Sequence, residues 1–590
     1  MCWKIGNLGS MIDFMTNQKI AQMLELLADL MEFQGANAFR LRAYRNGARV
    51  IREMPDSVAT LLENGEDLVQ FDGIGKGVAG KCQELVETGG LEQLDSMLEE
   101  VPRTVLDLLN VPKLGPKKAA AVFNELGIVN LEQLEAACLE GQLRQLTGFG
   151  EKTEQAILEG IAIAVAANQR ILWSKADQIV TDLRQHMLAG PAVNRLEFAG
   201  SYRRGKETVG DLDLLVDSDD ASAVMNHFAK FESIQSTIVR GDTKMSVRLE
   251  KEFQVDLRVV PEVSFGAALQ YFTGSKDHNV LVRGRAKQAG LKINEWGVYR
   301  MEGEQEEWVA GRSEEDVYKT LGLPLFPPEI REARRELEWA ESAPLPELIE
   351  LEDILGDLHM HTTATDGRAT LEEMVDAAKA SGLQYIAITD HSQRVAMANG
   401  LNAERLLQQW SKIDQLNRER GDEFIILKGI ECDILESGGM DLPDEVLCQA
   451  DWVIASVHYG QRQPRQQITD RIVGALENPH VSMVAHPTGR LINKREPYDV
   501  DLEAVFQAAA EYKKLLELNA NPKRLDLNDV HLMAAQSHGV PIVINTDAHR
   551  IEGFGDMKYG IKQARRGGLT ARDVANTLPW QEMKKLIGRD

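Results

Sequence analysis

Three features are scarce or missing in this sequence of 590 residues, and each absence excludes a class of protein. No apolar run approaches the roughly 20 residues of a membrane-spanning helix, so we expect no membrane partner. The five cysteines form no C-x-x-C pair, which argues against a disulfide framework or structural zinc and fits the reducing cytoplasm. Net positive charge is missing: 66 Lys and Arg stand against 91 Asp and Glu, and the net charge of −25 argues against a general nucleic-acid coat, although a local basic channel stays open.

The length predicts several domains, and the pattern of the chain divides it. Residues 1–16 lack both the apolar core of a signal peptide and helical periodicity, so we expect a disordered or non-native extension, with Met11 or Met15 as alternative starts. Six predicted regions follow. Residues 17–95 and 96–170 are both helical, and residues 171–262 are rich in strands. Residues 263–322 form the next region, a linker follows at 323–352, and the last region is 353–590. Within the linker we expect a helix near Glu329 to Glu341.

A short motif recurs three times in the helical region, as F-D-G-I-G-K-G-V-A-G-K, V-P-K-L-G-P-K-K-A-A-A-V and L-T-G-F-G-E-K-T-E-Q-A-I. Each copy resembles a helix-hairpin-helix, whose turn lets backbone N–H groups approach a phosphate at the positive end of a helix. One copy would be an ordinary helical hairpin, whereas three favour binding to the DNA backbone. The residues assigned to this contact are Gly73, Gly75, Gly115, Lys117, Gly148 and Gly150.

Three carboxylates form the first predicted chemical site. Asp211 and Asp213 are two residues apart on a predicted strand, so both point to one face, and Asp256 can join them from a neighbouring strand. Three carboxylates holding two Mg²⁺ ions about 3.5–4 Å apart is the arrangement used for in-line phosphoryl transfer.

The residues before these carboxylates favour that chemistry over a solvent-facing D-x-D. Gly200 and Ser201 place a backbone N–H and a hydroxyl beside the predicted metals, and Arg204 can neutralise triphosphate charge. This G-S stands upstream of the D-x-D at the spacing used by nucleotidyltransferases.

Nine metal-type side chains lie where apolar runs end in the last third of the chain. Runs such as Y-I-A-I-T-D-H and W-V-I-A-S-V-H are typical of buried parallel strands, and stretches with helical spacing separate them. This repetition predicts a parallel α/β barrel with its active site at the carboxyl ends of the strands. The nine are His359, His361, Asp366, His391, Glu431, His458, His486, Asp547 and His549. A polynuclear metal centre is the simplest use for so many ligands.

Other polar residues of the chain receive plainer interpretations. Arg490, in A-H-P-T-G-R, is a candidate phosphate contact. The histidines interpreted as ordinary structural residues are His186, His227, His480, His531 and His538.

The motifs G-S-Y-R-R-G, G-D-L-D, V-D-L-R and Y-F-T-G-S-K-D-H-N together resemble family X DNA polymerases of the polymerase beta type, over Asn17 to Leu321. The remainder resembles a PHP (polymerase and histidinol phosphatase) domain. The resemblance implies a multidomain α and α/β protein: a lyase-like domain at 17–95, fingers with helix-hairpin-helix motifs at 96–170, a nucleotidyltransferase palm with a mixed sheet at 171–262, a thumb at 263–322, and a distorted (β/α)7 PHP barrel at 353–590.

The resemblance also implies roles in the polymerase half. Asp211, Asp213 and Asp256 would bind two Mg²⁺ or Mn²⁺ ions, with Asp256 nearest the primer 3′-hydroxyl. The residues implied to hold the dNTP are Gly200, Ser201, Arg204, Gly210, Tyr271, Phe272, Gly274, Lys276 and Asn279. Arg283 would lie by the template minor groove, and Arg258 resembles an arginine that pairs with a catalytic aspartate. Phe272 can equally be core packing.

Two positions depart from the animal enzyme. Lys276 stands where that enzyme has an acid, so its charge can attract the nucleotide. Lys81 matches the Schiff-base lysine of the deoxyribose-phosphate lyase, yet Gly77 replaces a supporting lysine. A lyase lysine needs a depressed pKa among other cations, so lyase chemistry and a simple DNA phosphate contact both stay open for Lys81.

For the PHP half, the resemblance implies three Zn²⁺ or Mn²⁺ ions on the nine ligands and a 3′–5′ exonuclease and phosphodiesterase acting on DNA ends. We therefore expect a monomeric, cytoplasmic DNA repair polymerase that fills short gaps in gapped or primed DNA. One alternative is a nuclease whose polymerase half mainly binds DNA and nucleotide. Another is a non-enzymatic DNA-end scaffold, which would have lost metal ligands at both sites.

Overall fold

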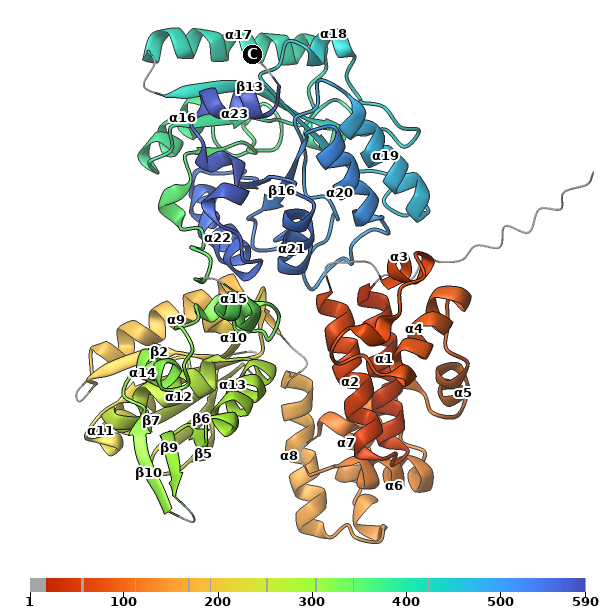
Figure 1. The fold of residues 1–590 in the computed structure, drawn as a ribbon, viewed down its shortest axis with the longest axis vertical. Helices are drawn as coiled ribbons and strands as arrows, with labels where there is room; N and C mark the ends of the chain where they lie inside the picture. The colour runs from red at the N-terminus through yellow and green to blue at the C-terminus, as the bar shows by residue number, and fades with distance from the viewer. Residues whose placement is uncertain are drawn as a thin grey trace, which may run out of the picture. The chain divides into compact units, whose positions relative to one another are not determined.

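The computed structural model describes residues 17–54, 58–111, 113–167, 170–190, 193–250, 253–302, 305–342, 344–421 and 424–588. The extension expected at 1–16 lies outside this part of the chain. The chain divides into two compact units: residues 1–169 with 251–253, and 170–250 with 254–590 (Figure 1). Among the described helices, none is long and apolar enough to cross a membrane.

The first unit is helical, as its periodicity predicts. Fully buried Ile20, Leu24 and Leu27 lie on one face of α1, which packs along α2. The helices are α1 (Asn17–Phe33), α2 (Ala38–Glu53), α3 (Val58–Glu63), α4 (Lys76–Thr88), α5 (Glu92–Glu100), α6 (Pro116–Leu126), α7 (Leu131–Leu139) and α8 (Glu151–Ala167). Short 3-10 turns join them: η1 (Leu68–Gln70), η2 (Arg103–Asn110) and η3 (Leu143–Gln145).

The second unit begins with a five-stranded mixed sheet in the order β2-β4-β7-β6-β5, in which only β4 and β7 are parallel. Its strands are β2 (Arg195–Phe198), β4 (Asp211–Asp217), β5 (Ser236–Arg240), β6 (Lys244–Arg248) and β7 (Gln254–Val260). A small ladder pairs β1 (Ile171–Leu172) with β3 (Thr208–Val209). The helices of this region are α9 (Trp173–Leu188), α10 (Gly200–Arg203) and α11 (Ala221–Phe228), with η5 (Glu262–Ser264) at its end.

The next region combines helices with a three-stranded antiparallel sheet. Its elements are α12 (Phe265–Thr273), α13 (Lys276–Gln288), β8 (Leu291–Asn294), β9 (Gly297–Glu302), β10 (Gln305–Ala310) and α14 (Glu314–Thr320).

The predicted linker is better packed than its Pro-rich composition indicates. Phe326 and Ile330 join the same core cluster as Val317 and Tyr318 of α14. The prediction of one helix near Glu329 to Glu341 is wrong in its start. The chain forms η6 (Pro328–Ile330), then α15 (Glu336–Ser342) and η7 (Leu351–Asp353).

The last region is the predicted barrel, with seven parallel strands in sequence order from β11 to β17. A bridge between Met360 and Ala548 brings the first strand back toward the last. The strands are β11 (Gly356–Asp357), β12 (Tyr385–Ile388), β13 (Ile425–Asp433), β14 (Trp452–Ser456), β15 (Met483–Val484), β16 (Leu515–Asn519) and β17 (Ile542–Asn545). Every residue of β12, β14, β16 and β17 is buried, which explains their continuous apolar sequence.

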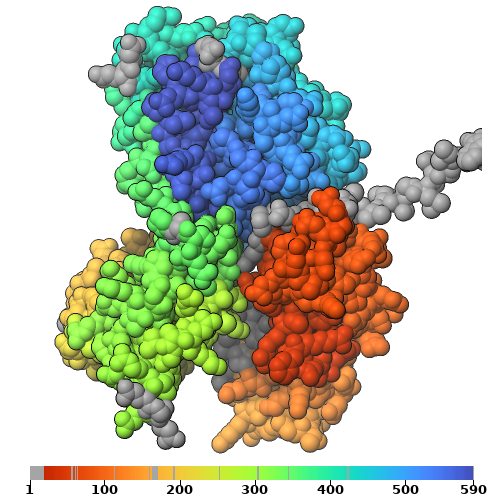
Figure 2. Space-filling view, viewed as in Figure 1, coloured from red at the N-terminus to blue at the C-terminus, as the bar shows by residue number. Residues whose placement is uncertain are grey.

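Helices lie around the outside of the barrel (Figure 1), and Figure 2 shows the surface of this region in green to blue. They are α16 (Leu371–Ala380), α17 (Ala403–Arg420), α18 (Asp444–Leu447), α19 (Arg465–Glu477), α20 (Leu502–Glu511), α21 (Asp529–Ser537), α22 (Met557–Arg566) and α23 (Trp580–Leu586). Short turns complete the region: η8 (Ala396–Ala398), η9 (Ile551–Asp556), η10 (Ala571–Asp573) and η11 (Ala575–Thr577).

Candidate active sites

All nine predicted barrel ligands gather at the carboxyl ends of the strands, where they form four groups that could each hold a metal ion. Two of them, His486 and Asp547, lie just past β15 and β17 with positive φ values of 30° and 54°. Residues other than glycine rarely adopt such angles, and strained residues of this kind are enriched at active sites. The backbone therefore turns sharply at these two positions, directly after the strands that carry them.

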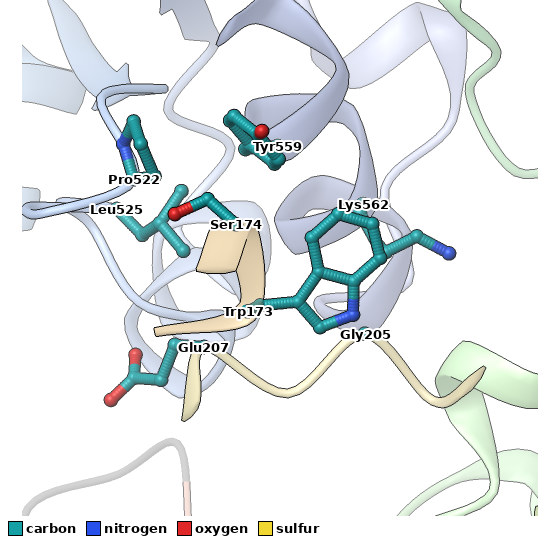
Figure 3. A pocket seen from close by; sticks show the side chains of 8 residues that line it. All are labelled: Trp173, Ser174, Gly205, Glu207, Pro522, Leu525, Tyr559 and Lys562. Atoms are coloured by element: carbon teal, nitrogen blue, oxygen red, sulfur yellow. The ribbon is translucent and has the colours of Figure 1, made fainter. Parts of the chain in front are cut away.

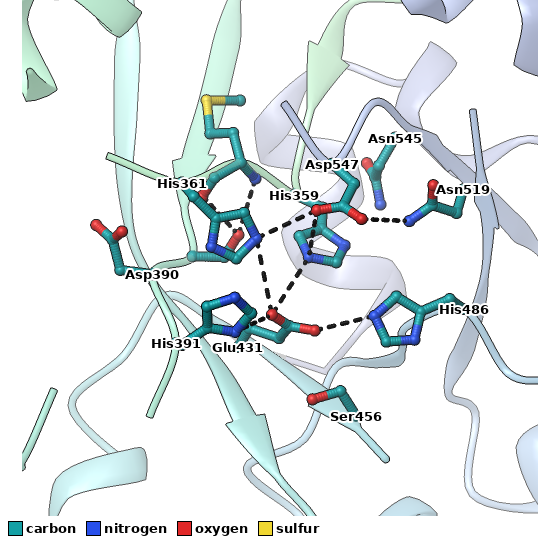
Figure 4. Close-up of polar contacts among 12 residues, drawn as sticks. His359, His361, Asp390, His391, Glu431, Ser456, His486, Asn519, Asn545 and Asp547 are labelled. Atoms are coloured by element: carbon teal, nitrogen blue, oxygen red, sulfur yellow. Dashed lines mark hydrogen bonds and ion pairs between the residues drawn. The ribbon is translucent and has the colours of Figure 1, made fainter. Parts of the chain in front are cut away.

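Glu431, on β13, lies at the centre of the cluster (Figure 4). Its Oε2 lies 2.7 Å from His391 Nδ1 and 3.7 Å from His359 Nε2. Its Oε1 lies 3.1 Å from His486 Nε2 and 3.4 Å from His458 Nε2. One carboxylate thus faces imidazoles from several strands, and with them it would hold metal ions.

Asp547 and Asp366 complete the cluster on either side of His361. Asp547 Oδ1 lies 3.2 Å from His361 Nε2, and Asp366 Oδ1 lies 3.8 Å from His361 Nδ1. Asp366 Oδ2 also lies 3.4 Å from both His391 Nε2 and His549 Nε2. Asp366 is exposed, so this end of the cluster faces the solvent.

The donor set fits metal ions. His359 Nε2, His361 Nδ1 and His486 Nδ1 are buried and have no hydrogen-bond partner. Leaving three buried ring nitrogens unpaired is costly unless a ligand binds them. Burial and the neighbouring rings of His549 and His391 lower the pKa of His361 to about 3, so its imidazole is neutral, the form that binds a metal.

A layer of acids behind the ligands was not predicted from the sequence. Glu517 Oε1 accepts a hydrogen bond from His359 Nδ1 at 2.7 Å, and Asp433 Oδ1 lies 3.0 Å from His458 Nδ1. Such carboxylates orient a metal-binding imidazole and increase its basicity. The available signal was a lone acid inside a buried apolar strand, as Glu517 is in L-L-E-L-N.

The cation beside this centre is Arg524, which the sequence did not single out. Its Nε lies 3.5 Å from Asp547 Oδ2. Arg490, the residue proposed from sequence, donates instead to the carbonyls of Arg524 and Leu525 and to Glu207 of the five-stranded region. Arg490 therefore has a visible structural role, and its contact with phosphate stays a prediction.

The second candidate site lies at the start of β4 and β7. The register pairs Asp213 with Asp256 on these adjacent parallel strands, as the sequence pattern predicted, and Asp211 stands two residues before Asp213. Burial, with the charges of Asp211 and Asp256, raises the pKa of Asp213 to about 7. Burial and Asp256 also raise the pKa of Asp211. Three acids that disfavour one another's charge are ready to accept cations between them.

Basic side chains surround these acids. Lys244 Nζ lies 3.4 Å from Asp256 Oδ2. The Arg258 guanidinium lies over the ring of Phe272 at 4.4 Å, and its charge acts against the raised pKa of Asp213. Within the described residues, groups of three donor atoms lying within 4.8 Å of one another occur only in the barrel, so the three acids here are more loosely gathered.

The turn of residues 200–205 begins against Asp213. Gly200 has φ of +64°, and a Cβ at that position would lie 2.8 Å from Asp213 Oδ2. Both the conformation and the space require glycine there. Ser201 follows at the start of the short helix α10, half-buried. Gly210 precedes Asp211, and a Cβ on it would approach Arg170 Nη1 at 3.1 Å.

The other predicted nucleotide residues are mostly held by neighbours. Arg204 is buried and bonds Glu332 and the carbonyl of Thr273. Asn279 Nδ2 donates to the carbonyl of Tyr271 at 2.7 Å. A Cβ on Gly274 would lie 2.7 Å from Asn279 Oδ1, which explains a glycine there.

Three further predicted residues have simpler surroundings. Phe272 packs edge-on against Tyr271, which leaves its core interpretation open. Lys276 and Arg283 are exposed on α13, and Arg283 Nε donates to the carbonyl of Asn279.

The three predicted hairpin motifs form the same turn. The amide of a buried apolar residue donates to the carbonyl three residues earlier, in Ile74, Leu114 and Phe149, at 3.0, 3.0 and 3.1 Å. Each is followed by a glycine that precedes a helix, namely Gly75, Gly115 and Gly150 before α4, α6 and α8.

The copies differ at the residue before the buried one. Gly73 and Gly148 have positive φ there, and Lys113 adopts φ of 71° in the second copy. They also differ in charge, because the third helix has Glu151 and Glu154 in its first turn. The geometry of a phosphate-binding turn is thus repeated, while the charge that favours phosphate is strongest at the first two copies.

Lys81, on α4, is bound to a neighbouring acid. Its Nζ lies 2.7 Å from Glu84 Oε2, and Glu84 Oε1 accepts the amide of Glu92. Gly77, where the lyase would have a lysine, has open space around its backbone. The lyase and phosphate-contact interpretations of Lys81 therefore both remain predictions.

The chain matches five protein families along its length. They are described as helix-hairpin-helix domain (residues 15–91), SAM-like helix-hairpin-helix tandem (105–162), DNA polymerase beta palm (173–257), DNA polymerase beta thumb (268–332) and PHP domain (357–521). The order is the one expected from the motifs.

Two kinds of curated relative match. The "DNA polymerase/3'-5' exonuclease PolX" of Bacillus subtilis strain 168 is 42% identical over 580 residues, which cover 98% of this chain and 100% of that protein. Probable phosphatases match the barrel region alone. One from Thermoanaerobacter sp. strain X514 is 31% identical over 38% of this chain and 89% of its own length. One from Caldanaerobacter subterraneus is 32% identical over 39% of this chain and 93% of its own length.

Proposed function

This chain belongs to the PolX family of DNA polymerases with a C-terminal PHP domain, and on that premise we propose that it fills short gaps in DNA and removes nucleotides from 3′ ends. The observation that carries the proposal is the presence of two separate strand-end sites with different donors. One has three carboxylates on β4 and β7, and the other has nine ligands around the barrel. Neither site has lost a predicted ligand.

In the palm, Asp211, Asp213 and Asp256 would hold two Mg²⁺ or Mn²⁺ ions, since their donor atoms are all oxygens. Bound ions would neutralise the negative charge of the triphosphate and would activate the attacking 3′-hydroxyl. Asp256 acts on the primer side. Its carboxylate is kept in place by Gln254 Nε2, which donates to Oδ1 at 2.8 Å, and by Lys244.

The incoming dNTP would lie between the turn at Gly200 and helices α12 and α13. Gly200, Ser201, Arg204 and Gly210 would hold the triphosphate, and Lys276 would attract it. Tyr271, Phe272, Gly274 and Asn279 would contact the sugar and base. The hydrogen bond from Asn279 to the Tyr271 carbonyl supports this, because it holds the side chain proposed to contact the base beside the residue proposed to contact the sugar.

In the PHP barrel, the nine ligands would hold three Zn²⁺ or Mn²⁺ ions, the ions that suit imidazole mixed with carboxylate. Bound ions would supply hydroxide near neutral pH and a clamp for the phosphodiester. Glu517 and Asp433 orient the imidazoles of His359 and His458. We assign Arg524 the role of contacting the negatively charged phosphate at the DNA end.

DNA would be bound through its backbone at the hairpins. The assigned residues are Gly73, Gly75, Lys81, Gly115, Lys117, Gly148 and Gly150, with Arg283 at the template minor groove. The uncapped N-termini of α4 and α6 support this, because no side chain accepts from their first amides.

We assign the domains as 17–95 lyase-like, 96–170 fingers, 171–262 palm, then thumb and PHP barrel. The thumb family extends to residue 332, and Phe326 and Ile330 pack in the thumb core, so we extend the thumb into the former linker. We place the protein in the cytoplasm as a monomer. The described cysteines Cys82, Cys138, Cys432 and Cys448, which are free thiols, support this location.

The test follows one labelled primer on a DNA with a short gap. With dNTPs and Mg²⁺ we expect extension to the end of the gap, and without dNTPs, with Mn²⁺, shortening from the 3′ end. Labels on both strand ends distinguish shortening from internal cleavage. Degradation without extension in either metal would favour the alternative, a nuclease whose polymerase half only binds DNA and nucleotide.

A further inference from the structure

The turn of residues 200–205 ends against a helix of the barrel. A Cβ on Gly205 would lie 2.3 Å from Lys562 Cγ on α22, so the contact requires a residue without a side chain. Beside it, the ring of Tyr202 stacks on Trp173 at 5.0 Å, and Trp173 meets Tyr559 of α22 at 5.6 Å. Figure 3 shows Trp173, Gly205, Tyr559 and Lys562 around one small pocket. Helix α22 thus packs on the motif that would bind a triphosphate.

Within this contact, one carboxylate joins two guanidinium groups. Glu332 Oε1 accepts from Arg204 Nε at 3.0 Å and from Arg566 Nη1 at 2.9 Å. Arg566 Nη1 also donates to the backbone carbonyl of Arg204 at 2.8 Å. Arg566 therefore holds Arg204 twice, through its main chain and, by way of Glu332, through its side chain.

The network is buried and charged throughout. Arg204, Glu332 and Arg566 are 9%, 5% and 5% exposed. Arg566 Nη2 reaches on to Asp529 at 2.7 Å. Burial alone would raise the pKa of Glu332, but the charges of Arg566, Lys206 and Arg204 hold it well below its usual range. Removing one partner would leave the others buried without a counter-charge, so each of these charged groups depends on the others.

The guanidinium of Arg204 is fixed on two of its nitrogens, because Nη1 donates to the Thr273 carbonyl at 2.7 Å while Nε binds Glu332. A group held in one orientation before its ligand arrives loses less freedom on binding.

We propose that Arg566 and Glu332 are positioning residues of the polymerase site, which hold Arg204 and its turn in the geometry that binds the dNTP triphosphate. Helix α22 of the barrel is then a structural part of the nucleotide site, although it belongs to the domain that carries the other activity. The proposal rests on the proposed function of the turn at residues 200–205 as a triphosphate site.

The test uses the full-length protein with Arg566→Gln and Glu332→Gln, each assayed for gap filling across a range of dNTP concentrations. We expect the KM for dNTP to rise about 10-fold, with kcat at saturating dNTP within about twofold of wild type, because ground-state and transition-state binding are lost together. The double variant should show the KM of the single variants and not their product, since the two residues act through one contact.

The matched control is Arg565→Gln. Arg565 is the neighbour of Arg566 on α22 and is also ion-paired, but its bonds go to Glu329, Glu350 and the carbonyl of Ile349. We expect its KM for dNTP to equal that of wild type. The 3′–5′ exonuclease rate of each preparation, measured on the same DNA without dNTPs, reports whether the barrel is folded.

Five outcomes separate the possibilities. A raised KM with unchanged exonuclease supports the proposal. An unchanged KM in both variants overturns it, and so does a lowered KM, which would mean that Glu332 competes with the triphosphate for Arg204. A parallel fall of both activities in the two variants also overturns it, as general destabilisation. Wild-type protein that adds no nucleotide would overturn the proposed function instead, which keeps the two failures apart.

Discussion

The barrel ligands lie at the carboxyl ends of parallel strands, whereas the palm acids lie at the start of two parallel strands, and the two sites hold their ligands differently. In the barrel, imidazoles and carboxylates alternate, and imidazoles from several strands contact the one carboxylate of Glu431. In the palm, Asp211, Asp213 and Asp256 are acids alone, and burial together with the neighbouring carboxylates raises the pKa of Asp211 and of Asp213. The barrel ligands therefore contact one another directly, whereas the palm acids repel one another unless cations lie between them.

The layer behind each site differs in the same way. Behind the barrel imidazoles stand the acids Glu517 and Asp433, which would increase the affinity for a metal ion. Beside the palm acids stand Lys244 and Arg258, whose positive charge balances that of the acids and would compete with a bound cation. Metal ions that bind tightly and exchange slowly would suit a hydrolytic centre. Ions that bind loosely and arrive with the triphosphate would suit nucleotide addition.

The largest expected effects come from a reciprocal pair of variants, which tests whether the two sites are independent. Asp256→Ala should reduce nucleotide addition at least about 1,000-fold, a barrier increase of about 4 kcal/mol, and spare the exonuclease. Asp547→Ala should do the reverse and lower the number of bound metal ions per chain. The measurement is extension and 3′ degradation by one preparation of each variant. Loss of both activities in a folded variant would contradict two independent sites.

An effect of intermediate size should come from the acids behind the barrel ligands. Glu517→Gln keeps the shape of the side chain but removes the charge that faces His359 Nδ1. We expect a metal affinity about 10–100-fold lower, with exonuclease activity restored by added Mn²⁺ or Zn²⁺ and gap filling unchanged. The measurement is exonuclease rate against metal concentration.

The control for this substitution is Glu511→Gln, which removes the same charge from an exposed position at the end of α20. An identical metal titration for Glu517→Gln and wild type would show that the acid does not tune the metal centre.

The ligands themselves could be predicted from the sequence, because a polar residue at the end of a buried apolar strand is costly to bury unless it binds a partner there. His486 was found in this way, and Asp256 was found as a carboxylate that can join Asp211 and Asp213 from a neighbouring strand. The supporting acid Glu517 was not predicted, because its apolar strand shows a lone acid but does not show which imidazole it would face.

Contacts between segments that are distant in the sequence also could not be predicted. Glu332 bonds Arg204 across 128 positions of sequence, from a segment whose composition predicted a solvent-exposed linker. The hairpin at Lys113 was recognised as a motif although its left-handed residue is a lysine, because the flanking Leu114 and Gly115 keep the pattern.

The smallest expected effect concerns DNA binding, which should change without altering either metal site. Lys117→Ala with Lys118→Ala should lower the log–log salt slope for gapped DNA by about one to two, since each phosphate neutralised contributes about 0.9. The lower value is expected if Lys118, which lies over the Phe149 ring at 5.4 Å, is occupied there. Sequence preference should not change, because backbone contacts carry no base information. Fluorescence titrations against salt on two unrelated gapped duplexes measure both quantities, and Lys584→Ala with Lys585→Ala on α23 removes the same charge as a control. An unchanged slope, or the same change in the control, would remove the second hairpin from the DNA-binding surface.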